Sequence, residues 1–438
     1  MLPVHERQPG VVQVEKATRV RYWVIVFAAT LAVVTYIDRV ALSVANLTIS
    51  KDLGLDSRQM GLAFMAFGVA YAAFEIPGGY LGDRLGPRSV LMRIVLWWSF
   101  FTAATGFTFN FISIATTQFL FGAGEAGCFP NLTKTFTTWL PSKERVRAQG
   151  IMWLSARWGG AFTPPLVVLV MSLVGWRHTF QIFGGLGVIW AVIFYRWYRN
   201  NPLDNPKLNE AERDLVRTAS ANARPHGDVP WARFFTSRQV WMICLQYFCL
   251  SYGWYFYITW LPTYLREERG QSPARAAFLA GLPLLFGGIG SLTTGLAPRR
   301  LPRRAIAFGG FAATAVLLVA VTRIESVVPA MLAMALASFA SDLTMPISWD
   351  ACVEIGGPYC ATVASSMNML GNLGGFVAPV IGGIILAHTH GNWNLVLEVM
   401  AALVFVAALC WLYIDPEAAR RDREVLQAQA MSADQLTP

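Results

Sequence analysis

Apolar residues recur along the chain in twelve runs of about 20 residues, separated by shorter polar connections. The hydrocarbon core of a bilayer is about 30 Å thick, and an α-helix needs about 20 residues to cross it. The pattern therefore predicts an all-α integral membrane protein with twelve transmembrane helices. The expected spans are residues 22–46, 58–80, 89–109, 111–133, 147–173, 178–199, 239–264, 274–296, 304–322, 326–349, 360–387 and 393–413.

The longest polar connection divides the twelve spans into two groups of six. Gly-Gly-Ala-Phe-Thr-Pro at 159–164 in the fifth span matches Gly-Gly-Phe-Val-Ala-Pro at 374–379 in the eleventh, which indicates an internal duplication. Two related six-helix bundles around a central site are a transporter architecture. The expected parts are an N-terminal tail (1–21), a first bundle (22–199), a linker (200–237), a second bundle (238–414) and a C-terminal tail (415–438).

The basic residues are distributed unequally between the two sides of this arrangement. If both termini lie inside, 24 of the 35 lysines and arginines fall in the inner segments and seven in the outer ones. This asymmetry predicts a multi-pass protein of the cell membrane with both termini in the cytoplasm. The net charge of +9 lies in short blocks between spans without a continuous basic face, so we expect lipid and not nucleic acid as its partner.

The composition disfavours an enzyme. Only 14% of the residues are charged, against about 25% in soluble domains. The six cysteines form no CxxC pair, the five histidines form no HExxH helix, and there is no GxxxxGK[ST] loop. We therefore expect no catalytic residues, no metal, no cofactor, no ATP-driven pump and no obligate protein partner.

Three ionisable residues interrupt otherwise apolar spans: Asp38 and Arg39 in the first, and Glu125 in the fourth. A charge at bilayer depth costs at least about 2.5–3.5 kcal/mol, so such residues usually serve a pathway or relay. We interpret Arg39 as a contact for an anionic substrate and Asp38 and Glu125 as proton carriers. The alternative is a structural role, in which Asp38 and Arg39 form a permanent ion pair that fixes helix packing.

The connection after the second span resembles a motif of the major facilitator superfamily, G-x-L-x-D-R-x-G-x-R. Every fixed position is met, with Gly79, Asp83, Arg84, Gly86 and Arg88 among them. We expect Asp83 to cap a helix end and to pair with a nearby arginine, which would latch the two bundles together on the inner face.

Within that superfamily, the chain resembles the anion:cation symporter family, which includes bacterial carriers of sugar acids. The resemblance implies proton-coupled symport of a small organic anion such as a hexonate, glucarate or hexuronate, driven by the proton gradient. It also implies that Asp38 and Glu125 couple protons, that Arg39 contacts substrate, and that Tyr36, Tyr71, Trp349 and Asn368 line the cavity. It rests on Tyr36-Ile-Asp38-Arg39, Tyr71, Glu75-Ile-Pro77-Gly-Gly79, Gly124-Glu125-Ala-Gly-Cys-Phe-Pro130, Trp260-Leu-Pro262-Thr-Tyr264, Trp349 and Asn368.

The chain departs from these carriers at one position. They carry an arginine seven residues before the glutamate of the fourth span, where this chain has Gln118. Gln118 still shares a helical face with Glu125, and we expect it among the substrate-binding residues. Arg157 in the fifth span stands where those carriers have a neutral glutamine. We infer that the second cation has moved to Arg157, which would pair with Glu125 or bind the anion; the alternative is a structural ion pair.

Two further questions stay open in the sequence. Asn368 and Asn372, one turn apart in the eleventh span, could donate to sugar hydroxyls or form hydrogen bonds between helices. The substrate could be another carboxylate, such as an aromatic acid or tartrate, and the transport could be exchange. A membrane sensor or an intramembrane enzyme is disfavoured, because no soluble signalling domain and no catalytic constellation is evident.

Overall fold

The computed structural model describes residues 16–221, 229, 231–297 and 302–418. Within these ranges the chain is α-helical, with three short 3-10 helices and no strand. The all-α prediction is therefore confirmed. Most of the predicted N-terminal tail, part of the linker and nearly all of the C-terminal tail lie outside the described residues.

The helices follow the predicted spans closely. The first half of the chain forms α1 (Trp23–Leu53), α2 (Ser57–Leu85), α3 (Pro87–Thr105), α4 (Phe111–Glu125), α5 (Cys128–Trp139) and α6 (Ser142–Trp197). The second half forms α9 (Arg238–Thr259), α10 (Leu261–Glu267), α11 (Pro273–Leu296), α12 (Arg303–Val321), α13 (Val327–Asp342), α14 (Met345–Gly356), α15 (Cys360–His388) and α16 (Trp393–Cys410). Two short helices, α7 (Glu210–Ala221) and α8 (Trp231–Thr236), belong to the connection between the halves.

Helix labels and membrane spans differ where a helix bends or breaks. Gly127, with φ of 80°, separates α4 from α5, and Gly175, with φ of 77°, divides α6 into two spans. The seventh predicted span is divided into α9 and α10 at Trp260, and the tenth into α13 and α14 at Leu343 and Thr344; neither junction contains a glycine. Among the described residues, seven helical stretches are long and apolar enough to cross a membrane, and those over 142–197 and 327–388 have the length for two crossings each.

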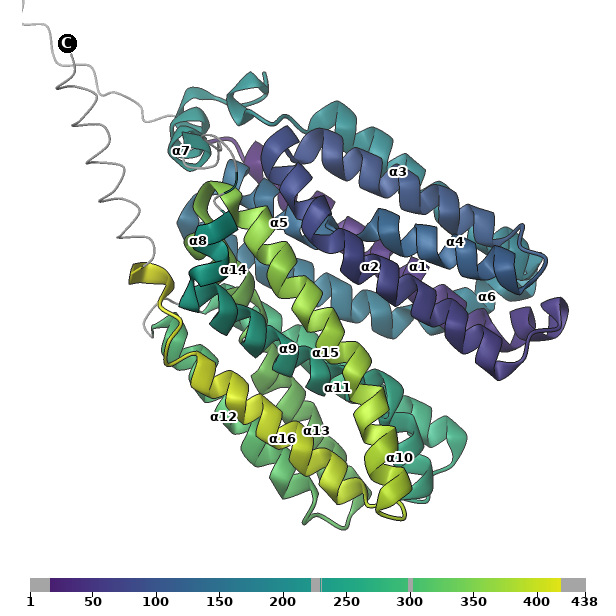
Figure 1. Cartoon of the computed structure of the whole chain (residues 1–438). Helices are drawn as coiled ribbons and strands as arrows, with labels where there is room; N and C mark the ends of the chain where they lie inside the picture. The colour runs from purple at the N-terminus through teal and green to yellow at the C-terminus, as the bar shows by residue number, and fades with distance from the viewer. Residues whose placement is uncertain (1–15, 222–228, 230, 298–301, 419–438) are drawn as a thin grey trace, which may run out of the picture.

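The helices form two groups that lie side by side, α1–α6 and α9–α16 (Figure 1). In the first group the glycine pair Gly159–Gly160 brings α6 against α1, next to Tyr36. In the second group Gly374 and Gly375 bring α15 against α9, next to Tyr255. The repeated sequence therefore makes equivalent helix contacts in both halves, because glycine lets two helix backbones approach closely.

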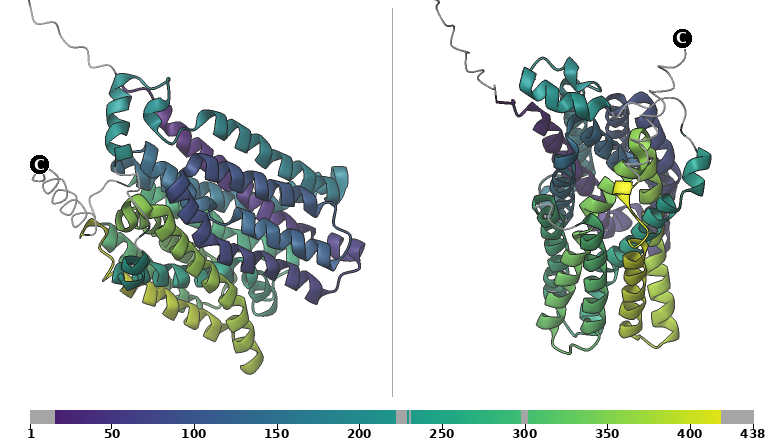
Figure 2. Two further views of the ribbon diagram at one scale, coloured as in Figure 1. Left: turned by 45° about the horizontal axis from the view of Figure 1, so that its top comes forward. Right: turned by 90° about the vertical axis from the view of Figure 1, so that its left-hand side faces the viewer.

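We use the name linker face for the end of the molecule at which α7, α8 and the last described residues lie (Figures 1 and 2). The two groups are in contact there and diverge toward the opposite face (Figure 1). Helices α2 and α15 face each other across the divide, as do α6 and α11. The structure is therefore closed at the linker face.

The connecting helix α7 is attached to the first group by buried charges. The carboxylate of Glu212, which is 0% exposed, accepts hydrogen bonds from the backbone nitrogens of Val20 and Arg21, each at 3.1 Å. The guanidinium of Arg21 pairs with Glu212 and with Glu144 of α6, both at 2.9 Å. These contacts fix α7 against the ends of α1 and α6.

Candidate functional site

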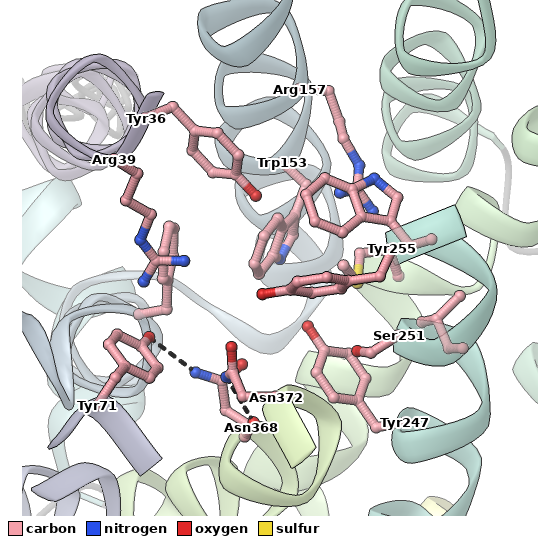
Figure 3. Close-up of a pocket in the computed structure, with 14 residues that line it drawn as sticks. Tyr36, Arg39, Tyr71, Trp153, Arg157, Tyr247, Ser251, Tyr255, Asn368 and Asn372 are labelled. Carbon is pink, nitrogen blue, oxygen red and sulfur yellow. Dashed lines mark hydrogen bonds between the residues drawn. The ribbon is translucent and has the colours of Figure 1, made fainter. Parts of the chain in front are cut away.

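A small pocket lies between the two helix groups (Figure 3). Its volume is about 40 Å³, and one water needs roughly 10–15 Å³ of such space. In this conformation the pocket therefore holds a few waters and is too small for an organic anion. Its walls come from α1, α2, α5 and α6 on one side and from α9, α14 and α15 on the other: Tyr36, Arg39, Tyr71, Phe129, Trp153, Arg157, Tyr247, Leu250, Ser251, Trp254, Tyr255, Met345, Asn368 and Asn372.

Arg39 lies in the wall of this pocket and is paired with Glu125. Its Nε lies 2.5 Å from Oε1 of Glu125, whose side chain is fully buried. The guanidinium lies over the ring of Tyr71, with 4.6 Å between Cζ and the ring centroid. Its Nη2 is buried without a hydrogen-bond partner among the described residues. A permanent Asp38–Arg39 pair is therefore not formed, because neighbouring residues on a helix point in different directions.

Asp38 occupies a different environment. Its side chain is 3% exposed, and neither carboxylate oxygen has a hydrogen-bond partner in the part of the chain that the structure describes. It does not line the pocket, although it follows Ile37 on the same helix as Tyr36 and Arg39. An ionised carboxylate without a partner is costly in a buried position, which makes Asp38 a suitable proton acceptor in chemical terms.

Arg157 also lines the pocket, but its partner was not identified from the sequence. Its Nε and Nη2 lie 2.7 and 3.0 Å from the two carboxylate oxygens of Asp342, at the end of α13. Both side chains are 2% exposed, and Trp254 stacks on the guanidinium at 4.4 Å. The expected pair with Glu125 is wrong, since Glu125 is held by Arg39. The available signal for Asp342 was an acidic residue inside the apolar run 326–349.

Two residues that were expected in the site lie outside the pocket wall in this conformation. Gln118 is buried, and its side-chain nitrogen donates to Oγ1 of Thr105 at 3.2 Å. Trp349 is 0% exposed, and its Nε1 donates to the hydroxyl of Tyr247 at 3.2 Å. The Trp349 ring packs on Trp153 with 5.3 Å between centroids, so Trp349 supports two lining residues from behind.

Asn368 of α15 joins the two helix groups. The side-chain nitrogen of Asn368 donates to the hydroxyl of Tyr71 at 3.1 Å and to Glu75 at 2.7 Å. Glu75 is 0% exposed and also accepts from the backbone nitrogen of Gly127 at 3.1 Å. Asn372 donates to the backbone oxygen of Asn368 at 2.8 Å. In the sequence, Glu75 stands out only as part of a family motif. Its hydrogen-bond partners, Asn368 and the backbone nitrogen of Gly127, are evident only in the folded chain.

Asp83 connects the two groups at the linker face. Its carboxylate accepts from the backbone nitrogens of Ala361 and Thr362, at 3.2 and 2.7 Å, and from the Thr362 hydroxyl at 2.8 Å. It thus caps the first turn of α15, where the helix dipole favours a negative charge. Its cation is Lys134 of α5, at 3.0 Å, in place of the expected arginine. Lys134 also donates to the backbone oxygen of Pro358.

The other motif residues shape the linker face in different ways. A Cβ on Gly79 would lie 2.0 Å from the Ser365 hydroxyl, so this glycine permits the close approach of α2 and α15. Gly86, with φ of 82°, forms the turn between α2 and α3. Arg84 is exposed and donates to Tyr80 on its own helix. Arg88 donates twice to the backbone oxygen of Tyr195, at 3.1 and 2.9 Å, within the first group.

Comparisons with known proteins give consistent matches. The sequence profile of the Major Facilitator Superfamily matches residues 28–379. The chain is 34% identical over 394 residues to the probable sulfoacetate transporter SauU of Cupriavidus necator, covering 87% of this chain and 91% of that protein. It is 31% identical over 396 residues to the probable L-galactonate transporter of Escherichia coli K12, covering 87% of this chain and 86% of that protein.

Two solved structures share the fold. The proton:xylose symporter XylE superposes with a TM-score of 0.72 at 13% identity, over 90% of this chain and 96% of that one. The fucose:proton symporter FucP of E. coli superposes with a TM-score of 0.72 at 15% identity, over 91% of this chain and 100% of that one. These likenesses confirm the predicted fold of two pseudo-symmetric helix bundles.

Proposed function

Because this chain belongs to the Major Facilitator Superfamily, a family of membrane transporters, we propose that it carries a small organic anion across the cell membrane together with protons. The two bundles alternate between a state that is open at the linker face and a state that is closed there. We further propose that the linker face is cytoplasmic and that the proton gradient drives accumulation without a cofactor. The observation that carries the proposal is Arg39 in the wall of a pocket between the bundles.

The chemistry of Arg39 suits an organic anion. A guanidinium presents its donors in a planar fork that matches a carboxylate. Its Nη2 has no partner among the described residues, so an incoming anion can make its first hydrogen bond there before Arg39 leaves Glu125. The rings of Tyr36 and Tyr71 and the amides of Asn368 and Asn372 lie in the same walls and supply stacking surfaces and hydrogen-bond donors for a hydroxylated chain.

The relatives narrow the class of substrate. They are described as transporters of sulfoacetate, L-galactonate, and galactarate or D-glucarate, all of which are small organic anions. We propose a sugar acid, such as a hexonate, glucarate or hexuronate, as the first candidate. A short sulfonate such as sulfoacetate is the second candidate, favoured by the 34% identity to SauU. An aromatic acid or tartrate, or exchange in place of symport, would be recognised in the same transport assay.

The pair of Arg39 and Glu125 gives a physical route to proton coupling. When an anion engages Arg39, Glu125 loses the partner that neutralises it in a fully buried position. A buried carboxylate without a partner costs several kcal/mol, and a proton removes that cost. Release of the anion lets Arg39 return to Glu125, which then gives up the proton. Asp38 is the second proton carrier, since its carboxylate is buried near this pair without a hydrogen-bond partner among the described residues.

Transport into proteoliposomes tests this proposal. With an imposed pH gradient, the wild type should accumulate one of the candidate anions above its external concentration, and a proton ionophore should abolish the accumulation. Glu125→Gln keeps the shape of the side chain but cannot release a proton, so it should lose uphill accumulation and retain counterflow of labelled substrate. Uphill transport at the wild-type level by this variant would refute the coupling role of Glu125.

The role of Arg39 is tested separately. Arg39→Ala should lose substrate binding, with an expected decrease of about tenfold or more, since a charged hydrogen bond contributes about 1.5–3 kcal/mol. Arg177→Ala is the matched control, because it also removes one arginine from an ion pair, but the two side chains of that pair are 39% and 49% exposed. Equal affinities in the wild type and Arg39→Ala would exclude Arg39 as the anion contact.

A further inference from the structure

The pair of Arg157 and Asp342 is the second buried ion pair at the pocket, and it joins the two bundles. Arg157 belongs to α6 of the first bundle and Asp342 to α13 of the second. Two parallel hydrogen bonds of 2.7 and 3.0 Å connect them, and both side chains are 2% exposed. Bidentate pairs of this kind are strong and directional.

The second bundle is shaped to hold Asp342 in this position. A Cβ on Gly287 of α11 would lie 2.5 Å from a carboxylate oxygen of Asp342, so only glycine leaves room for it there. The hydroxyl of Ser291, one turn further along α11, donates to the backbone oxygen of Asp342 at 3.2 Å. Asp342 is not part of the pocket wall, and it therefore holds Arg157 from behind.

The two arginines lie on different sides of one pocket. Tyr36 precedes Arg39 by about one turn on α1, and Trp153 precedes Arg157 by about one turn on α6. In Figure 3 the rings of Tyr36 and Trp153 lie between the two guanidinium groups. Each arginine is balanced by one carboxylate of the protein, Arg39 by Glu125 and Arg157 by Asp342.

We propose that Arg157 forms a second anion subsite and that the substrate is a dianion with an acidic group at each end. One acidic group binds Arg39, and the other takes Arg157 from Asp342, whose freed carboxylate then takes up a proton as Glu125 does when Arg39 leaves it. The inference rests on the proposed function and deepens it, because it assigns the charge of the substrate. Arg157 cannot be left without a partner in a dry position when the bundles move apart, and the second acidic group provides the replacement.

Matched pairs of anions test this inference. Galactarate and galactonate differ by one terminal carboxylate in place of a hydroxymethyl group, and so do sulfoacetate and isethionate. Binding of all four to the purified protein in nanodiscs is measured by titration calorimetry. At least one dianion should bind about tenfold or more tightly than its matched monoanion, the effect of one charged hydrogen-bonded contact.

Three variants locate the origin of that preference. Arg157→Gln should remove the preference for the dianion and change the affinity for the monoanion by less than about threefold. Asp342→Asn removes the competing carboxylate, so it should increase the ratio of dianion to monoanion affinity. The double variant Arg157→Gln with Asp342→Asn contains no buried unpaired charge, which keeps the test valid if a single variant does not fold. The ratio of dianion to monoanion affinity of this double variant should be near one.

Opposite results would overturn the inference. A wild type that binds both members of each pair equally has no second subsite. If Arg157→Gln or the double variant keeps the wild-type ratio, or weakens both anions equally, the pair is only a structural connection. The pair is also only a structural connection if Asp342→Asn lowers the ratio of dianion to monoanion affinity. If none of the four anions binds and none is taken up, both proposed substrate classes fail, whereas uptake without the predicted ratio of dianion to monoanion affinity overturns only the dianion subsite.

Discussion

Replacing Asp83 by asparagine should open the linker face. Asp83→Asn preserves the size of the side chain but removes its charge and one of its two acceptor oxygens. The hydrogen bonds that Asp83 accepts from Ala361 and Thr362 exist only where α2 and α15 are in contact, whereas its pair with Lys134 of α5 lies within the first bundle. The substitution therefore weakens the contacts between the bundles in the closed conformation only, whereas the loss of the pair with Lys134 affects both conformations.

The magnitude follows from the hydrogen bonds that an asparagine cannot accept. Asp83 accepts three hydrogen bonds from Ala361 and Thr362 and pairs with Lys134 at 3.0 Å. An asparagine oxygen can retain the two bonds from Thr362 but not the one from Ala361, and the retained bonds no longer involve a charge. A hydrogen bond to a charged group contributes about 1.5–3 kcal/mol and one between neutral groups about 0.5–1.5 kcal/mol. The loss of one bond between the bundles and the weakening of two should destabilise the closed conformation relative to the open one by about 3 kcal/mol. Because about 1.4 kcal/mol corresponds to a tenfold change, the open population should rise about 100-fold.

A buried cysteine at the linker face reports this change. Cys360 begins α15, is 0% exposed, and its sulfur lies 3.8 Å from the hydroxyl of Thr137 on α5. Separation of α5 and α15 exposes this thiol to water. Its labelling by a water-soluble maleimide, followed by mass spectrometry of the purified protein, should accelerate about 100-fold in Asp83→Asn, until the rate of a free thiol is reached.

Controls separate opening from unfolding. Cys360→Ser in the same background should remove the accelerated labelling. Asp52→Asn neutralises a carboxylate that is 49% exposed at the opposite face and should leave the rate unchanged. If Cys360 reacts at the wild-type rate in a folded Asp83→Asn protein, the reasoning that Asp83 holds the linker face closed is refuted.

Three other substitutions test separate parts of the fold. Gly79→Ala places a Cβ 2.5 Å from the backbone oxygen of Ala361, so labelling of Cys360 should rise about tenfold; an unchanged rate would show that α2 can shift without opening. Glu212→Ala removes the carboxylate that holds Arg21, and amide hydrogen exchange in α7 should become faster; retained protection would exclude this pair as the attachment. Gly175→Ala meets no atom within 4 Å but forces alanine to φ of 77°. The strain of about 1–3 kcal/mol should lower the thermal midpoint, while an unchanged midpoint would mean that the junction relaxes.

The positions of the helices could be predicted because they depend on local properties. An apolar run of about 20 residues is driven into a helix by the bilayer, since every backbone polar group must be satisfied within the segment. The breaks at Gly127 and Gly175 lie within or beside the predicted spans. A single span was expected over residues 111–133, and the structure bends it because Gly127 adopts a left-handed conformation.

The charged residues of the candidate site could be predicted from the sequence, but the ion pairs that they form could not. The sequence identified Arg39, Glu125 and Arg157, because ionisable residues are conspicuous in apolar segments. It did not assign Asp342 as the partner of Arg157, although the same criterion applies to it.

The amino-acid sequence alone determined the helical segments, the division into two related halves and the residue types available for binding an anion. Only the tertiary structure decided which charges meet: Arg39 with Glu125, and Asp83 with Lys134. The physical reason is that helix formation in a membrane depends on consecutive residues, whereas an ion pair depends on the crossing of helices that are distant in the chain. Arg157 shows the difference most clearly, since its partner lies 185 positions away in the other bundle.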